Sequence, residues 1–292
     1  MGLTIGIDAS RNRSGGAVAH LTGILSAGNP QKHCIHTIHV WAYQSLLKLL
    51  PDCAWLVKHN PTELEQDLTQ QLIWQATKLS GEVNAAGCQL LFTTDASTLC
   101  RFKPMVVMSQ DMLSYESGIM RHFGWSIARL RLIAILVLQN WAMKRAMGVI
   151  FLTRYAAQVI QKKTGTLSNI AIIPHGLDES FRQPDSLSCW PQNGERPIRC
   201  LYVSNTAMYK HQWEVVRAIS MLRKHGRTIK LNLVGGGSGR AQKLLNDEIV
   251  SSDPDKRFVT AMPFLPHHEL PLLLADTDLF VFASSCENLP VT

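Results

Sequence analysis

The chain alternates short apolar runs with amphipathic helical patterns, and this alternation limits the folds open to it. Helical patterns stand out at 61–79 and 126–147. Apolar runs with strand character lie at 3–8, 35–41, 53–58, 88–94, 105–109, 148–153 and 169–174. Strands that alternate with helices predict an α/β fold with a doubly wound parallel sheet.

The alternation stops once and then resumes. Residues 182–197 are rich in proline and lack periodicity, which indicates a linker. Strand runs follow at 198–204, 229–236, 257–261 and 278–283, with helical patterns at 211–224, 239–250 and 267–274. We therefore predict a first domain over 1–181, a linker over 182–197 and a second domain over 198–292. Two Rossmann-like domains of this kind face each other across a cleft, and the second is short of at least one covering helix.

Composition supports a globular chain with a preference for phosphate-rich partners. A length of 292 residues favours two domains, and 46% hydrophobic with 17% charged residues is a globular balance. The net charge of +7 favours nucleotides, nucleic acid or an anionic membrane surface. The 7 cysteines include no C-x-x-C pair, which disfavours zinc and disulfides and favours a reducing cytoplasm. No signal peptide or membrane span is evident, so we expect a soluble, cytoplasmic protein.

Two glycine-rich turns are candidates for phosphate contact. Gly15 and Gly16 follow the first strand and open a helix, and Gly235 and Gly236 hold the same position in the second domain. A helix start beside glycine favours an anion, although an ordinary βα turn explains each pattern equally well. Lys210 lies just beyond the first strand of the second domain, where an ammonium group can reach a phosphate.

The candidate metal ligands have simpler explanations. Asp276 and Asp278 lie at the amino end of the run at 278–283, whereas ligands bind at carboxyl ends, so a helix-to-strand turn is the better interpretation. Strand alternation places His36 and His39 on opposite faces, and His267-His268 lacks the second histidine of a zinc-protease helix. We predict no metal site.

The helical pattern at 126–147 carries four cations around an apolar face. They are Arg129, Arg131, Lys144 and Arg145. A core helix with a solvated edge is the simpler explanation of this pattern. The same pattern also suits a helix that makes peripheral contact with an anionic membrane.

The order of the motifs in the second half resembles glycosyltransferase family four, whose members are retaining enzymes of the GT-B fold. The matching segments are "IIPHGLDESF", "LYVSNTAMYKHQ", "LNLVGGG" and "LPLLLADTDLFVFASSCENLP". The family's last motif contains two glutamates separated by seven residues. Glu287 matches the first, and the second would lie beyond Thr292, so the resemblance implies that the chain ends within its donor-binding motif.

The resemblance also implies roles for individual residues. Lys210 would neutralise the departing diphosphate, and Glu287 would bind hydroxyls of the donor sugar. The backbone near Asn288 and Leu289 would approach the phosphates. Among the donor-binding residues, Gly15 and Gly16 match the glycine loop of the first domain, while Asn205, Gly235 and Gly236 belong to the second. The donor is a nucleotide diphosphate sugar, and neither a metal nor another cofactor is expected.

Two positions depart from the family pattern. Asn205 stands where an arginine is usual, which removes one positive charge at the phosphates, and Arg240 is a candidate to replace it. Gln110-Asp111 stands where a histidine often follows the strand. Both departures concern catalysis and not the fold.

The sequence thus predicts a hexosyl-type glycosyltransferase that acts with retention on a glycan or lipid-linked acceptor, in cell-surface polysaccharide synthesis, at the inner face of the membrane. A sugar-nucleotide epimerase of the same fold and a truncated, inactive nucleotide-binding module remain alternatives. Nucleic acid is disfavoured as a partner because the basic residues are scattered and no aromatic-plus-basic strand motif occurs.

Overall fold

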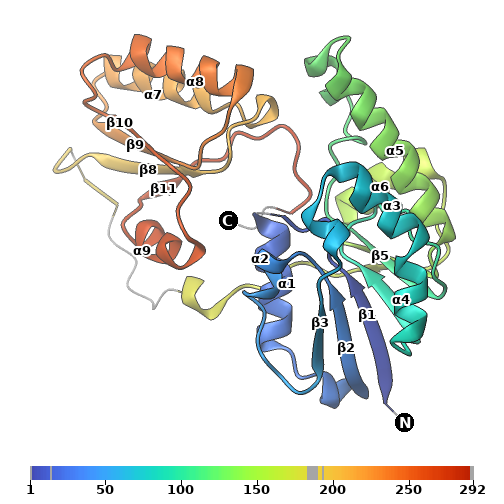
Figure 1. Cartoon of the computed structure of the whole chain (residues 1–292). Helices are drawn as coiled ribbons and strands as arrows, with labels where there is room; N and C mark the ends of the chain where they lie inside the picture. Colours follow the sequence, from blue (N-terminus) through green and yellow to red (C-terminus); the bar gives the residue numbers. More distant parts are fainter. Residues whose placement is uncertain (1, 14, 183–189, 193, 290–292) are drawn as a thin grey trace. The chain divides into compact units, whose positions relative to one another are not determined.

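The computed structural model describes residues 2–13, 15–182, 190–192 and 194–289 (Figure 1). Contacts divide the chain into two compact units. Unit 1 comprises Met1–Gly176 with Glu287–Val291, and unit 2 comprises Leu177–Cys286 with Thr292. Among the described residues, this division places 177–182 in unit 2 and 287–289 in unit 1. Each unit is described by itself below.

Unit 1 is built on a parallel sheet of seven strands. The strands are β1 (Leu3–Asp8), β2 (Ile35–Trp41), β3 (Leu56–His59), β4 (Leu90–Thr93), β5 (Met105–Ser109), β6 (Gly148–Phe151) and β7 (Ile170–Ile172). Their order is β3-β2-β1-β4-β5-β6-β7. The direction of winding reverses between β1 and β4, which makes the carboxyl ends of these two strands the switch point where such sheets bind ligands.

The helices of unit 1 connect these strands. They are α1 (Gly16–Ala27), α2 (Gln44–Leu47), α3 (Leu68–Thr77), α4 (Leu79–Ala85), α5 (Ile127–Arg145) and α6 (Arg154–Thr164). Single 3-10 turns lie at Pro30–His33, Thr62–Glu65 and Ile119–Phe123. The caps explain several starts, because Ser126 accepts a hydrogen bond from the Arg129 amide at the start of α5, and Thr153 does the same for α6.

The prediction of one helix over 61–79 is wrong. Pro61 leads into a 3-10 turn that ends at Glu65, and Asp67 then caps a separate helix, α3, by accepting a bond from the Gln70 amide at 3.0 Å. A second break follows at Lys78, and α4 begins at Leu79. The period of the apolar residues was helical, but local capping divides the segment into three pieces.

Unit 2 contains a parallel four-stranded sheet in the order β10-β9-β8-β11. The strands are β8 (Ile198–Val203), β9 (Ile229–Val234), β10 (Val259–Met262) and β11 (Leu279–Phe280). The helices are α7 (Gln212–Lys224), α8 (Gly239–Ser252) and α9 (Leu270–Ala275), with 3-10 turns at Glu179–Phe181, Met208–Lys210 and His267–Glu269. β11 is shorter than the predicted strand at 278–283.

Strand alternation in β8 forms the two cores of unit 2. Cys200 and Tyr202 pack with Val216 of α7 and Leu245 of α8. Their neighbours Leu201 and Val203 face the other side and pack with Leu270 of α9. Figure 1 accordingly shows α7 and α8 over one face of the sheet and α9 over the other. This double cover confirms the doubly wound arrangement predicted for the second domain.

The aspartates of the "DTD" segment form ion pairs that join the sheet to the chain before it. Asp278, whose side chain is 1% exposed, accepts two bonds from Arg196 at 2.5 and 2.7 Å, and Arg199 also contacts it at 3.3 Å. Asp276 pairs with Arg199. The arginines lower the pKa of the Asp278 carboxyl well below its usual range, mainly through the hydrogen bonds from Arg196. The turn interpretation is confirmed, because Asp276 caps the end of α9 and β11 begins directly after Asp278.

Candidate functional site

The glycine turn of unit 2 brings two loops into backbone contact. Gly235 has φ +125°, and a Cβ there would lie 2.1 Å from the carbonyl oxygen of Ser204. A Cβ on Gly237 would lie 2.8 Å from the Thr206 carbonyl oxygen, so this position is restricted as well. A Cβ on Gly236, in contrast, would meet nothing within 4 Å. The Thr206 amide donates to the Gly236 carbonyl at 2.9 Å. Gly235 is therefore needed for packing, and Gly236 leaves open space that a ligand can enter.

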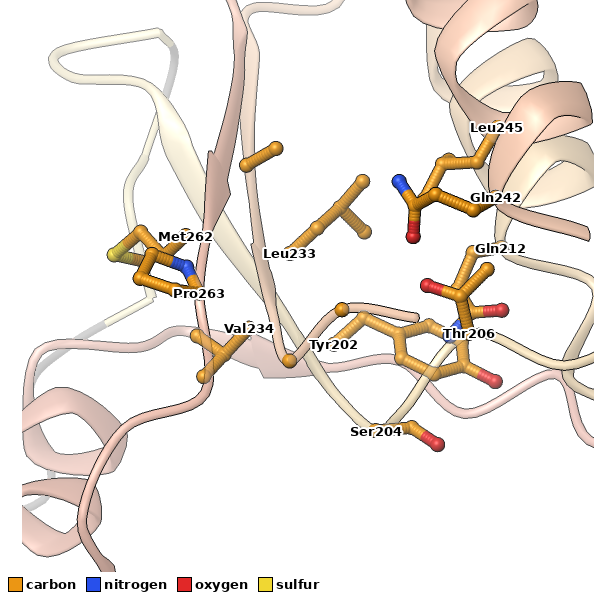
Figure 2. A pocket seen from close by; sticks show the side chains of 13 residues that line it. Tyr202, Ser204, Thr206, Gln212, Leu233, Val234, Gln242, Leu245, Met262 and Pro263 are labelled. Atoms are coloured by element: carbon orange, nitrogen blue, oxygen red, sulfur yellow. The ribbon is translucent and has the colours of Figure 1, made fainter. Parts of the chain in front are cut away.

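A cavity of about 140 Å³ lies at the carboxyl ends of β8, β9 and β10. Its lining comes from these strand ends, from the loops that follow them and from the first two turns of α7 and α8 (Figure 2). The residues are Tyr202, Ser204, Thr206, Gln212, Leu233, Val234, Gly235, Gly236, Gln242, Leu245, Ala261, Met262 and Pro263. This is the edge of a parallel α/β sheet at which ligands bind.

Two glutamines of this cavity have buried amide oxygens that lack a hydrogen-bond partner in the described part of the chain. Gln212 is 2% exposed and donates from its amide nitrogen to the Asn205 carbonyl at 3.0 Å, which leaves its oxygen unpaired. Gln242 donates to Asn246 at 2.8 Å, and its oxygen is also unpaired. Figure 2 shows the Gln242 amide directed toward Leu233. Buried acceptors without partners are costly, so a ligand with N–H or O–H donors fits this cavity. The sequence reasoning missed both residues: Gln212 ends the segment "LYVSNTAMYKHQ", where only the lysine and Asn205 were considered, and Gln242 belongs to no quoted motif.

Lys210 precedes the cavity residue Gln212 by two positions, at the end of the 3-10 turn that follows β8. It is 7% exposed, and its ammonium lies 4.9 Å from the centre of the Phe282 ring and 5.2 Å from that of Tyr209. The Tyr202 hydroxyl donates to the Lys210 carbonyl at 2.6 Å. Aromatic faces stabilise a cation and hold its stem in place. The lysine is therefore an anchored charge and not a solvated one.

The loop after β11 joins the loop after β8 within unit 2. The Ser285 amide donates to the Tyr209 carbonyl at 2.8 Å, and the Ser285 hydroxyl lies 3.1 Å from Nε2 of His211. The structure thus brings the segment that ends at Cys286 beside the turn of Lys210. The exposed side chain of Asn205 lies on the same loop, and Arg240 is exposed in the first turn of α8.

The predicted residues Glu287, Asn288 and Leu289 belong to unit 1 by their contacts. The Asn288 amide donates to the carbonyls of Ser109 and Gln110 at 2.9 and 3.2 Å, and the Thr153 hydroxyl donates to its oxygen at 3.3 Å. The side chain of Asn288 thus holds this segment at the ends of β5 and β6. The predicted approach of its backbone to phosphates stays a prediction.

Acidic side chains gather at the same edge of unit 1. The residue Asp111 is exposed, but its carboxyl group is partly desolvated, which raises its pKa, and the negative charges of Asp95 and Glu287 add to the increase. Asp111 was treated from the sequence only as the replacement of a histidine. A carboxyl group with a raised pKa at a strand end is a candidate proton acceptor, which that reasoning missed.

The switch point of unit 1 contains a buried polar network and a second cavity. Burial raises the pKa of Asp8, while hydrogen bonds from Ser10 at 2.6 Å and Gln75 at 2.7 Å oppose the increase. Beside it lies a cavity of about 440 Å³. Its lining is Ser10, Arg11, Arg13, Gln66, Asp67, Leu68, Gln71, Asp95 and Arg131. Three arginines outnumber two aspartates in this lining, so an anionic group is a suitable occupant.

The glycine turn of unit 1 lies at the same strand end. Gly15 has φ +65° and caps α1, which has no acidic residue in its first turn. A Cβ on Gly15 would meet nothing within 4 Å. Gly15 is therefore open to a ligand, and the predicted contact of Gly15 and Gly16 with the donor stays a prediction. Over the residues described, no group of three or more His, Cys, Asp or Glu side chains could hold a metal ion.

No family model matches the chain, but comparison with curated proteins identifies a glycosyltransferase as a relative. A curated 2-deoxystreptamine glucosyltransferase from Streptomyces kanamyceticus is 24% identical over 258 residues, which cover 84% of this chain. The chain spans 59% of the length of that relative.

Solved structures match nearly the whole chain. A sucrose-phosphate synthase from Thermosynechococcus elongatus has a TM-score of 0.73 and 14% identity, with 99% of this chain and 77% of that chain covered. HepE of Anabaena, in complex with UDP-glucose, has a TM-score of 0.68 and 17% identity, with 98% and 75% covered. These neighbours are GT-B glycosyltransferases, and with its two parallel sheets the chain has their fold.

Proposed function

We propose that this chain is a glycosyltransferase that moves a hexose from a nucleotide diphosphate sugar to an acceptor hydroxyl. The observation that carries the proposal is the arrangement at the carboxyl edge of the sheet in unit 2. A cavity with unpaired amide acceptors there adjoins an open glycine, Gly236. Lys210 is anchored in the loop that follows β8 at the same edge. A relative that is a glucosyltransferase and a neighbour that binds UDP-glucose support the choice of donor.

The donor would be bound mainly by unit 2. Its base and ribose supply the N–H and O–H donors that Gln212 and Gln242 lack, and its diphosphate takes the charge of Lys210. Asn205, Gly235 and Gly236 surround the nucleotide. Lys210 acts by stabilising negative charge as the diphosphate leaves, so no metal is required.

The reaction would proceed with retention. The acceptor oxygen bonds to the anomeric carbon on the face from which the diphosphate departs, the bond from that carbon to the phosphate oxygen breaks, and the acceptor proton passes to the leaving phosphate. The acceptor is a glycan or a lipid-linked precursor, of the kind used in cell-surface polysaccharide synthesis in the cytoplasm. The arginine-lined cavity of unit 1 supports an acceptor with an anionic group.

The test is turnover of uridine and guanosine diphosphate sugars, followed by phosphorus and proton NMR without metal. We expect slow release of the nucleoside diphosphate from one donor, with a sugar whose first-formed anomer is that of the donor. Lys210→Met should reduce this rate about 100-fold or more, since one lost contact to developing charge costs about 3 kcal/mol. Lys224→Met, at an exposed lysine of α7, is the control. Equal rates for both variants would remove Lys210 from the mechanism.

A further inference from the structure

The longest helix of unit 1, α5, presents an apolar stripe to the surroundings. Five of its large side chains are exposed, and we call them the outer stripe: Ile127 at 85%, Leu130 at 65%, Ile133 at 41%, Val137 at 62% and Trp141 at 38%. Their spacing of three and four residues places them in one row along the helix. Trp125, just before the helix, is 96% exposed.

The opposite side of α5 is the one that packs on unit 1. Its buried residues are Leu132, Gln139, Ala142 and Met143. At about 100° per residue, these lie across the helix axis from the outer stripe. A surface helix normally turns polar side chains outward, so a second apolar face marks a binding surface. Figure 1 shows α5 on the outside of unit 1.

The charges on α5 all have one sign. Arg129 and Arg131 lie on the two sides of the outer stripe, Lys144 and Arg145 lie at its end, and the helix has no aspartate or glutamate. The guanidinium of Arg129 lies 4.9 Å from the Trp125 ring centre, and that of Arg145 lies 3.8 Å from that of Trp141. An apolar row bordered by cations, with a tryptophan at each end, is complementary to the boundary between acyl chains and anionic headgroups.

We propose that the outer stripe of α5 docks unit 1 on an anionic phospholipid surface, with the helix lying in the plane of the interface. A second copy of the chain fits less well, because a symmetric contact through α5 would oppose the same cations on both copies. No helix in the described residues has the length and apolar character that a bilayer crossing needs, so the contact is one of a helix lying on the surface.

Arg131 links this surface to the second cavity of unit 1. It belongs to α5 and also lines the arginine-rich cavity. Docking through α5 thus brings Arg131, which forms part of the cavity wall, close to the headgroup layer, where a lipid-linked acceptor carries its phosphate. The docking proposal concerns the place of action and not the donor, so it can fail while the donor assignment stands.

The test is flotation of the whole chain with vesicles of phosphatidylglycerol and phosphatidylcholine, and with vesicles of phosphatidylcholine alone. We expect binding to the anionic vesicles that falls as salt is added. The double variant Leu130→Gln, Val137→Gln should lower the partition coefficient about tenfold or more, as should Arg129→Gln with Lys144→Gln. The matched controls are Ile73→Gln with Val250→Gln, two exposed apolar residues of α3 and α8, and Lys224→Gln with Lys243→Gln.

Failure of the native chain to float with anionic vesicles would overturn the proposal, and so would equal binding by the outer-stripe variant and its control. Binding to phosphatidylcholine alone that is insensitive to salt would also contradict it. Sedimentation velocity tests the alternative that a second copy of the chain covers the outer stripe. A native dimer that the outer-stripe variant converts to a monomer would assign the stripe to contact between copies. All variant positions are exposed except Arg129, which is half-buried, and the circular dichroism of every variant should match that of the native chain.

Discussion

The main chain at Gly235 passes so close to Ser204 that a Cβ on the glycine would lie 2.1 Å from the serine carbonyl oxygen. Its φ of +125° also disfavours any residue with a side chain. We predict that Gly235→Ala lowers the free energy of unfolding by about 3 kcal/mol. The adjacent Gly236→Ala should change it by less than about 1 kcal/mol, because space is open there. Urea denaturation measures the free energy of unfolding of both variants. Equal values for Gly235→Ala and Gly236→Ala would contradict the close packing of the two loops.

The buried Asp278 gives a pH-dependent prediction. Its arginine partners hold the pKa of the Asp278 carboxyl below the pKa that this carboxyl has in the unfolded chain. The ion pairs therefore stabilise the folded chain above the unfolded pKa, and this contribution is lost as the pH falls through the folded pKa. At neutral pH, Asp278→Asn should lower the free energy of unfolding by about 3 kcal/mol. The difference from the native chain should shrink below about pH 4.

The exposed pair of Asp255 and Arg257 provides the matched control for Asp278. These two side chains are 62% and 74% exposed and lie 2.8 Å apart. Asp255→Asn should cost less than about 1 kcal/mol at any pH, because water screens the pair. A loss that is the same for both variants in chemical denaturation would show that the buried pair does not hold β11 to β8.

The bonds of Asn288 predict how firmly its segment is held in unit 1. Its side chain bridges the ends of β5 and β6 through three hydrogen bonds. Asn288→Ala should speed amide hydrogen exchange at 287–289 by about tenfold or more, since each bond contributes about 1 kcal/mol. Asn84→Ala, at an exposed position of α4, should leave that exchange unchanged. Unchanged exchange in Asn288→Ala would mean that these bonds do not order the segment.

The unpaired oxygen of Gln242 predicts opposite effects on stability and binding. Gln242→Leu removes a buried acceptor that lacks a partner, so the free chain should keep its stability. Affinity for a nucleoside diphosphate should fall about tenfold, which corresponds to the loss of one hydrogen bond of about 1.4 kcal/mol. Calorimetry measures the affinity, and Gln70→Leu on the exposed side of α3 is the control. Native affinity in Gln242→Leu would place the nucleotide outside this cavity.

Strand positions were the most predictable part of the fold. The limits of β1, β2 and β5 agree with the apolar runs, because a strand buried in a parallel sheet needs continuous apolar character. The helix over 61–79 was mispredicted, since the 3-10 turn and the Asp67 cap depend on local hydrogen bonds that periodicity does not report. The same limit explains the missed Gln212, whose importance comes from its burial, and Asp111, whose importance comes from charged neighbours distant in sequence.

The most direct measurement is calorimetric titration of the chain with uridine and guanosine diphosphates, first without metal and then with magnesium. The proposed function predicts that one nucleotide binds without metal, that magnesium adds little, and that Lys210→Met weakens binding about tenfold or more while Lys224→Met does not. Absence of binding by either nucleotide, or full affinity in Lys210→Met, would contradict the assignment of this edge of unit 2 to a nucleotide diphosphate sugar.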